Sequence, residues 1–96
     1  MRLVWTETAL GHLEGISQYI SRTSPVYAAQ VLRRIVERSG QLAEFPQSGR
    51  MVSEYQRADV REVLEPPYRI IYQVAASHVN VLAVVHMRRA DLGIQP

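Results

Sequence analysis

Apolar residues recur through the first part of the chain with the period of an α-helix. From Glu7 to about Ser21 they are spaced by three or four residues, which predicts an amphipathic helix. Thr6 is placed to act as its N-cap, and Glu7 puts a negative charge in the first turn, where the helix dipole favours one. The stretch from Met1 to Trp5 predicts a short strand in front of this helix.

A second apolar stripe follows after a short link. Ser24 is a suitable N-cap and Pro25 suits the first helical position, so we expect a helix from Pro25 to about Ala43. The residues of its apolar stripe are Ala28, Val31, Leu32, Ile35 and Val36. Two helices joined by so short a link are expected to pack as an antiparallel hairpin.

The helical period ends at a loop, which we expect to run from Phe45 to about Arg57, because Pro46 and Gly49 mark a break. Three strands and a tail should follow: Val60 to Glu65, Tyr68 to Ala75, Val79 to Met87, and an irregular or singly turned segment from Arg89 to Pro96. The predicted fold is α+β, with an N-terminal strand, an antiparallel helical hairpin and a three-stranded antiparallel meander. We expect a single domain over residues 1–96. Its helices would cover one face of the sheet and leave the other face open.

The last hairpin can be given a register if Ser77 and His78 form a two-residue turn. Tyr72 would then lie opposite Ala83 and Ile70 opposite Val85, which makes one apolar face. On the other face, Arg69 would lie opposite His86, with Arg88 one step further along. These three residues would therefore gather at one end of the open face, and a different turn would break the cluster.

Two interpretations of this cluster remain open. It could form an anion or phosphate site, in which the arginines stabilise negative charge and His86 transfers a proton. Alternatively, Arg69 and Arg88 pair with Glu62, Glu65 or Asp91, and His86 is a partly buried sheet residue. The remaining histidines, His12 and His78, are expected to be solvated, and no pair of histidines has the spacing of a metal site.

Composition narrows the class of protein. All 11 basic residues are arginine, which excludes any mechanism that needs a lysine. There is no cysteine, and therefore neither a disulfide scaffold nor a thiolate metal site, and no motif indicates a cofactor. No apolar run approaches the roughly 20 residues of a membrane-spanning helix, and no signal peptide is recognisable. We therefore expect a cytoplasmic protein without membrane contact.

The order of these elements resembles that of RelE/ParE-type toxins. The motifs that carry the resemblance are the Ser24-Pro25 link, Phe45-Pro46-x-x-Gly49-Arg50, Arg61-Glu62, the segment Tyr68 to Val74, and the segment Val85 to Arg89. The resemblance covers the chain from Val4 to about Asp91. It implies the toxin of a type II toxin–antitoxin module, also called a plasmid stabilization module, which a co-expressed antitoxin neutralises.

The superfamily has two branches, and the resemblance favours one of them. RelE-like members cut messenger RNA in the ribosomal A site without a metal, whereas ParE-like members inhibit DNA gyrase. The RelE pattern has two lysines on the strand before the Tyr-Arg motif, one arginine in that motif, another after the last strand, and often a C-terminal tyrosine. Arg69 and Arg88 match the arginines, but Val60 and Glu62 stand at the lysine positions and Ile94 about where the tyrosine would be. A glutamate at that place would repel a phosphate, which favours the ParE-like branch.

The two branches assign different roles to the same residues. In the ParE-like interpretation no catalytic residue is expected, and the candidates for target binding are Arg69, His86, Arg88 and Arg89. In the RelE-like alternative, Arg69, His86 and Arg88 would be the catalytic residues of a metal-independent endoribonuclease. The implied partners are a cognate antitoxin in a hetero-oligomer and DNA gyrase, or alternatively the ribosome and its mRNA. Operator DNA would be contacted only through the antitoxin.

Overall fold

The computed structural model describes residues 1–89 and 91–96, and it confirms the predicted α+β fold with one further strand. The elements, in chain order, are β1 (Arg2–Trp5), α1 (Glu7–Ser21), α2 (Pro25–Glu44), β2 (Arg50–Met51), β3 (Val60–Glu65), β4 (Tyr68–Val74) and β5 (His78–His86). They form a five-stranded sheet in the order β1-β5-β4-β3-β2. β1 runs parallel to β5, and the other neighbouring strands are antiparallel. The two-residue strand β2 was not predicted.

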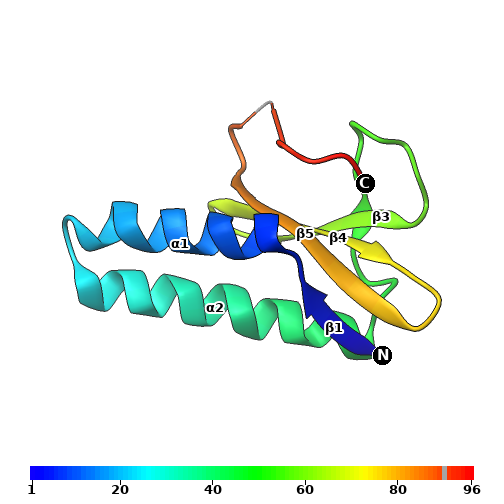
Figure 1. Ribbon diagram of the computed structural model, residues 1–96, viewed down its shortest axis with the longest axis horizontal. Helices are drawn as coiled ribbons and strands as arrows, with labels where there is room; N and C mark the ends of the chain where they lie inside the picture. Colours follow the sequence, from blue (N-terminus) through cyan, green and yellow to red (C-terminus); the bar gives the residue numbers. More distant parts are fainter. Residues whose placement is uncertain (90) are drawn as a thin grey trace.

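Both helices begin at the residues that the sequence indicated. The Thr6 side chain accepts a hydrogen bond from the Ala9 amide at 3.1 Å, and the Ser24 hydroxyl accepts one from the Tyr27 amide at 3.1 Å. Pro25 stands in the first turn of α2, where its missing N–H costs nothing. The two helices lie side by side as an antiparallel hairpin along one side of the sheet (Figure 1).

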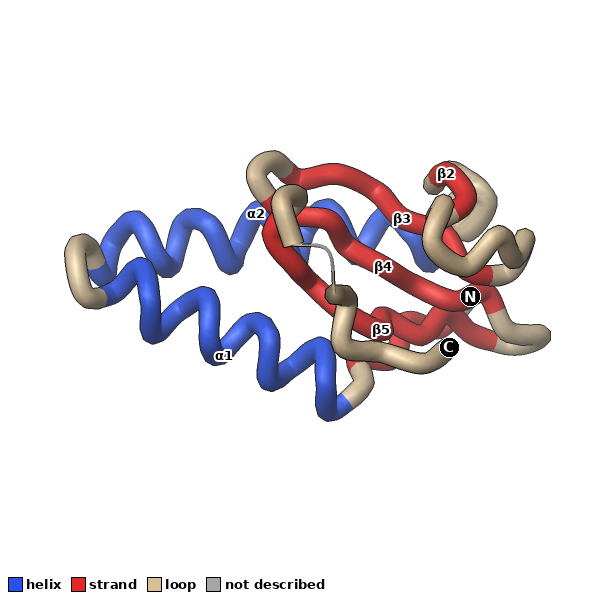
Figure 2. The backbone as a smooth tube through the Cα atoms, turned by 90° about the horizontal axis from the view of Figure 1, so that it is seen from above, coloured by secondary structure: helices blue, strands red, loops and turns tan. Residues whose placement is uncertain are grey.

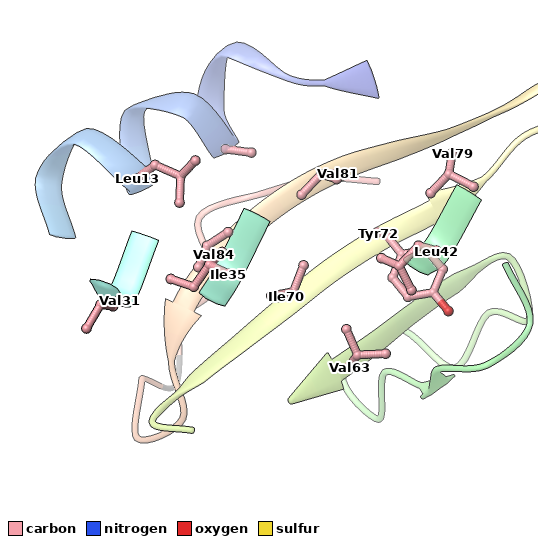
Figure 3. Packing of buried hydrophobic residues seen from close by; sticks show 11 residues of the cluster. Leu13, Val31, Ile35, Leu42, Val63, Ile70, Tyr72, Val79, Val81 and Val84 are labelled. Atoms are coloured by element: carbon pink, nitrogen blue, oxygen red, sulfur yellow. The ribbon is translucent and has the colours of Figure 1, made fainter. Parts of the chain in front are cut away.

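The main core lies between the hairpin and the sheet. Figure 3 shows side chains of α1 and α2 directed toward those of β3, β4 and β5. Its buried residues are Ala9, Leu13, Val31, Ile35, Leu42, Val63, Ile70, Tyr72, Val79, Val81 and Val84. The helical spacing and the strand alternation thus bury their apolar positions against each other.

The predicted register of the last hairpin was wrong. The Ala75 amide donates to the His78 carbonyl at 2.9 Å, so the turn comes one residue earlier than expected and His78 belongs to β5. A register shift follows beside Ile71, with the result that Arg69 pairs with Val85 rather than with His86. A bulge of this kind moves every later side chain to the other face of the sheet.

The second face of the sheet is not left bare, contrary to expectation. The loop before β3 and the C-terminal tail lie over this face, on the side opposite α2 (Figure 2). They close a second apolar cluster of Val52, Val60, Ile71, Ala83, Val85 and Leu92, flanked by Tyr55, Leu82 and Ile94. The tail is held by bonds from Tyr55 Oη to the Ile94 carbonyl and from Arg57 Nη1 to the Pro96 carbonyl. It is irregular as predicted over its described residues, whereas Ala90 lies outside them.

Candidate functional site

The Arg69 side chain forms ion pairs within the protein. Its side chain is only 10% exposed, and Nε and Nη2 both contact Glu62 Oε1, at 2.8 and 2.6 Å. Nη1 and Nη2 also donate to the two carboxylate oxygens of Glu54, each at 3.0 Å. The structural interpretation of Arg69 therefore holds for Glu62, with Glu54 in place of the Glu65 or Asp91 that the sequence offered.

The pocket around Arg69 is electrically balanced. It measures about 210 Å³, and its charged lining residues are Arg50, Arg69, Glu54 and Glu62. Arg50 Nε donates to Glu62 Oε2 at 2.8 Å, so the buried Glu62 carboxylate has a guanidinium on each oxygen. Hydrogen bonds from Arg69 hold the pKa of Glu54 at about 2, and the same two carboxylates raise the pKa of Arg69. Two cations and two anions cancel, which leaves no net charge to attract a phosphate.

His86 lies on the opposite face of the sheet from Arg69. It pairs with Tyr68, whose ring meets the His86 ring edge-on with centroids 6.0 Å apart. Both rings border α1, not the Arg69 pocket. His86 Nδ1 accepts a hydrogen bond from the Arg88 amide at 3.1 Å. The structure therefore does not bring Arg69 and His86 together, because the bulge in β5 separates them.

Arg88 and Arg89 are exposed just after the end of β5. Arg89 borders the same groove as His86 and His12, and its charge contributes to lowering the pKa of His12. Of the four sequence candidates, His86, Arg88 and Arg89 are thus accessible from outside, whereas Arg69 is not.

A groove runs between α1 and the last residues of β5. Its volume is about 360 Å³, and it is lined by Gly11, His12, Gly15, Ile16, Tyr19, Tyr68, Val84, Val85, His86 and Arg89. No aspartate or glutamate is among these residues. His12, which was expected to be solvated, is half-buried here, and its Nδ1 accepts a hydrogen bond from the Val84 amide at 3.1 Å. Burial first and the nearby Arg89 second lower the pKa of His12.

A pair of glycines inside the first helix could have indicated this groove from the sequence. Gly11 and Gly15 are spaced by four residues, so they lie on the same side of α1, and both line the groove. A Cβ added at either glycine would meet no atom within 4 Å. Glycine inside a helix lowers the stability of that helix, so two glycines on one side of α1 indicate a surface kept free of side chains.

The tip of the helical hairpin carries an exposed apolar patch beside this groove. Tyr19, Val26 and Tyr27 are 71%, 70% and 49% exposed, and the Arg22 guanidinium lies 6.0 Å from the centre of the Tyr19 ring. Because Tyr19 also lines the groove, the two surfaces are continuous. Large apolar side chains exposed next to one another are typical of a protein interaction surface.

The described part of the chain contains neither a metal-binding cluster nor a membrane-spanning helix. Residues 1–89 and 91–96 contain no cluster of three histidine, cysteine or acidic side chains that could hold a metal ion. Neither helix of these residues has the length and apolar character needed to cross a membrane.

Comparison with known proteins identifies the family. Residues 3–91 match the family described as "ParE toxin of type II toxin-antitoxin system, parDE". "Toxin RelE2" of Caulobacter vibrioides is 37% identical over 89 residues, which are 92% of this chain and 97% of that protein. The structure of the "Chromosomal ParDE TA system from P. aeruginosa" superposes with a TM-score of 0.76 at 27% identity, covering 90% of this chain and 95% of that one. A "YoeB/ParE toxin from Agrobacterium tumefaciens" shares the fold, with a TM-score of 0.64 at 19% identity over 90% and 98% of the two chains. The chain belongs to the ParE toxin family of type II toxin–antitoxin systems, within the RelE/ParE superfamily, and this membership implies an antitoxin as its partner.

Proposed function

We propose that this toxin inhibits DNA gyrase and is not a ribosome-dependent ribonuclease. The observation that carries the proposal is the closed ion-pair network of Arg69. A nuclease of this superfamily would need that arginine to meet the scissile phosphate, but here Arg69 bonds to two glutamates. A phosphate would have to displace both carboxylates from a pocket without net charge.

The position of His86 supports the same proposal. A proton-transferring histidine must lie within hydrogen-bond reach of the group that it serves. His86 borders α1 on the opposite face of the sheet from Arg69, so the two cannot act on one phosphate. In this proposal the exposed Arg88 and Arg89, with His86 beside them, contact the target and catalyse nothing.

The antitoxin is proposed to cover the exposed patch formed by Tyr19, Val26 and Tyr27 at the hairpin tip. A partner that buries these side chains gains roughly 25 cal/mol for each Å² of apolar surface removed from water. The proposed complex is a hetero-oligomer in the cytoplasm, which contacts operator DNA through the antitoxin alone. Expression of the toxin without its antitoxin should stop growth, and it should cause filamentation if gyrase is the target.

Two assays with the purified toxin separate the candidate targets. In the first, gyrase supercoils a relaxed plasmid in the presence of increasing toxin, and we expect inhibition or accumulation of cleaved DNA. In the second, a translating extract receives the same toxin, and the message is mapped for cuts at ribosome-bound codons. Intact message beside inhibited gyrase supports the proposal. Cut message with unaffected supercoiling would establish the ribonuclease alternative, which the name of the relative "Toxin RelE2" keeps under consideration.

A further inference from the structure

The groove between α1 and the end of β5 has the size and the lining of a small-molecule site. Its volume of about 360 Å³ falls in the range of pockets that bind small ligands, roughly 300–1,000 Å³. Such pockets are lined mainly by apolar and aromatic side chains, with a few polar groups that orient the ligand. The groove has both kinds of lining.

Two glycines leave room for a ligand on the α1 side of the groove. Gly11 and Gly15 are one helical turn apart, and both are exposed. A Cβ added at either position would meet no atom within 4 Å. The backbone of α1 is therefore uncovered along this side, and a flat ligand can approach it closely.

The apolar part of the lining is rich in aromatic rings. Ile16 and Tyr68 pack against the main core and also line the groove. The Tyr68 ring meets the His86 ring edge-on, with centroids 6.0 Å apart. Burial first, then the phenols of Tyr27 and Tyr19, raise the pKa of Tyr68, so these phenols lie near it. Aromatic rings of a ligand pack favourably edge-to-face or offset against such side chains.

Both histidines of the groove have one ring hydrogen free to donate. His12 Nδ1 accepts from the Val84 amide and His86 Nδ1 accepts from the Arg88 amide, each at 3.1 Å. A ring nitrogen that accepts a hydrogen bond carries no hydrogen, so in both rings the hydrogen is on Nε2. Within residues 1–89 and 91–96, no protein group accepts a hydrogen bond from either Nε2.

Arg89 adds a positive charge that no carboxylate balances. It lines the groove, and after burial its charge is the second cause that lowers the pKa of His12, so the guanidinium lies near that ring. None of the ion pairs formed by residues 1–89 and 91–96 includes Arg89. Two acids near the groove have other contacts: Asp91 Oδ1 accepts from the Gly93 amide at 2.9 Å, and Glu65 lines a separate pocket beside α2.

We propose that this groove binds a small monocarboxylate with an aromatic body. The carboxylate would meet the Arg89 guanidinium and the Nε2 hydrogens of His12 and His86. The aromatic body would lie over the two glycines and against Ile16 and Tyr68. One cation with two further N–H donors matches a singly charged anion, and the apolar lining disfavours an anion without an apolar body.

The test titrates the full toxin with phenylacetate and follows ¹H–¹⁵N spectra. Phenylacetamide has the same ring without the charge, and acetate has the charge without the ring. For an acid of this size we expect a Kd in the order of 1 mM. The amide should bind at least about tenfold more weakly, because it lacks the charge-assisted bonds, and acetate should give no saturable shifts. Signals of the Gly11 and Gly15 amides and of the two imidazole Nε2 atoms should move with the acid.

Two pairs of variants locate the ligand. Gly15→Leu places a side chain in the groove, whereas Gly40→Leu places the same side chain on α2, where a Cβ also meets nothing within 4 Å. Both changes favour the helical conformation, so both proteins should fold. We expect Gly15→Leu to weaken binding by about tenfold or more and Gly40→Leu to leave it within about twofold. Arg89→Gln should weaken binding by about tenfold. Its control is Arg33→Gln, on an arginine that is 69% exposed, and this change should have no effect.

Three results would each overturn the inference. Equal affinity for phenylacetate and phenylacetamide would show that the cation and the two Nε2 donors do not select the ligand. Equal affinity of Gly15→Leu and Gly40→Leu would place the ligand outside the groove. Absence of saturable binding up to about 20 mM would rule out a site of this kind. His86 and Arg89 also belong to the surface proposed to contact the target, but binding is measured without gyrase, so the gyrase proposal stands or falls separately.

Discussion

Replacing Arg69 with alanine should lower the stability of the toxin. Toxicity should fall only as a result of this loss of stability. Arg69 is 10% exposed and bonds to Glu62, which is 4% exposed. Removing one partner of a buried ion pair costs about 3–5 kcal/mol, because the remaining charge is left without compensation. Arg50 still donates to Glu62, but its side chain is 66% exposed, so we expect a loss near the lower end, about 3 kcal/mol.

Thermal unfolding followed by circular dichroism measures this loss. For a chain of this size, 1 kcal/mol lowers Tm by about 4–8 °C, so Arg69→Ala should lower it by about 12–24 °C. The matched control is Arg33→Ala, since Arg33 and Glu37 form a pair 3.9 Å apart in which both side chains are 69% exposed. That change should cost less than about 1 kcal/mol. Arg69→Met combined with Glu62→Leu should recover most of the stability, because apolar residues of similar volume replace a buried pair at little cost.

Toxicity decides between the structural and the functional role of Arg69. In the structural role, growth inhibition by Arg69→Ala falls only as the folded fraction falls, and the Arg69→Met, Glu62→Leu protein is toxic again. The reasoning would be refuted by an Arg69→Ala protein that melts within a few degrees of the wild type and is nevertheless harmless. Arg69 would then contact the target, and the pocket around it would have to open.

Three further changes test other parts of the structure. Glu54 has a pKa of about 2 in the fold against an ordinary 4.5, so the stability that it contributes is present above about pH 4.5 and is lost as the pH falls toward 2. Glu54→Gln should therefore make the fall of Tm between about pH 4.5 and pH 2 less steep. The pKa of His12 is lowered from 6.5, so the unfolded chain binds the proton more readily than the folded chain. The contribution of His12 to stability should be complete above about pH 6.5 and decline below it, and His12→Phe should abolish this decline in Tm. Gly49→Ala should lower Tm in the same experiment by several degrees, because the added Cβ would lie 2.5 Å from the Tyr72 hydroxyl oxygen.

Local signals in the sequence were sufficient to predict where the helices begin and end. The N-caps Thr6 and Ser24 and the proline at position 25 act within one turn, so their effect does not depend on the rest of the fold. The boundaries of α1 agree with the prediction, and α2 ends one residue later, at Glu44. The strands β3, β4 and β5 were each found to within one residue at their ends, because the apolar alternation and the Pro66-Pro67 turn mark them.

Register and pairing partners could not be derived in the same way. An alternating strand fits its neighbour in several registers, and the choice was made by a turn at Ala76 and Ser77 and by a bulge near Tyr72, neither of which has a strong sequence signature. The loop that supplies Glu54 gave no sign that it would fold over the sheet. The position of His12 was missed for a related reason, since its partner is a backbone amide 72 residues away.

The network around Arg69 shows how neighbouring charges decide what an arginine on this sheet face can bind. An arginine on the sheet face is a phosphate ligand only while its donors are free and the local charge is positive. With glutamate at position 62, the same guanidinium binds a buried carboxylate at 2.6 Å, and Glu54 from the preceding loop takes the donors that remain on the other edge. The loop is thereby held over the second apolar cluster, so Arg69 contributes to closing this face of the sheet. The acid at position 62 thus makes the neighbouring arginine part of the structure, which in the proposed function leaves target contact to the exposed end of β5.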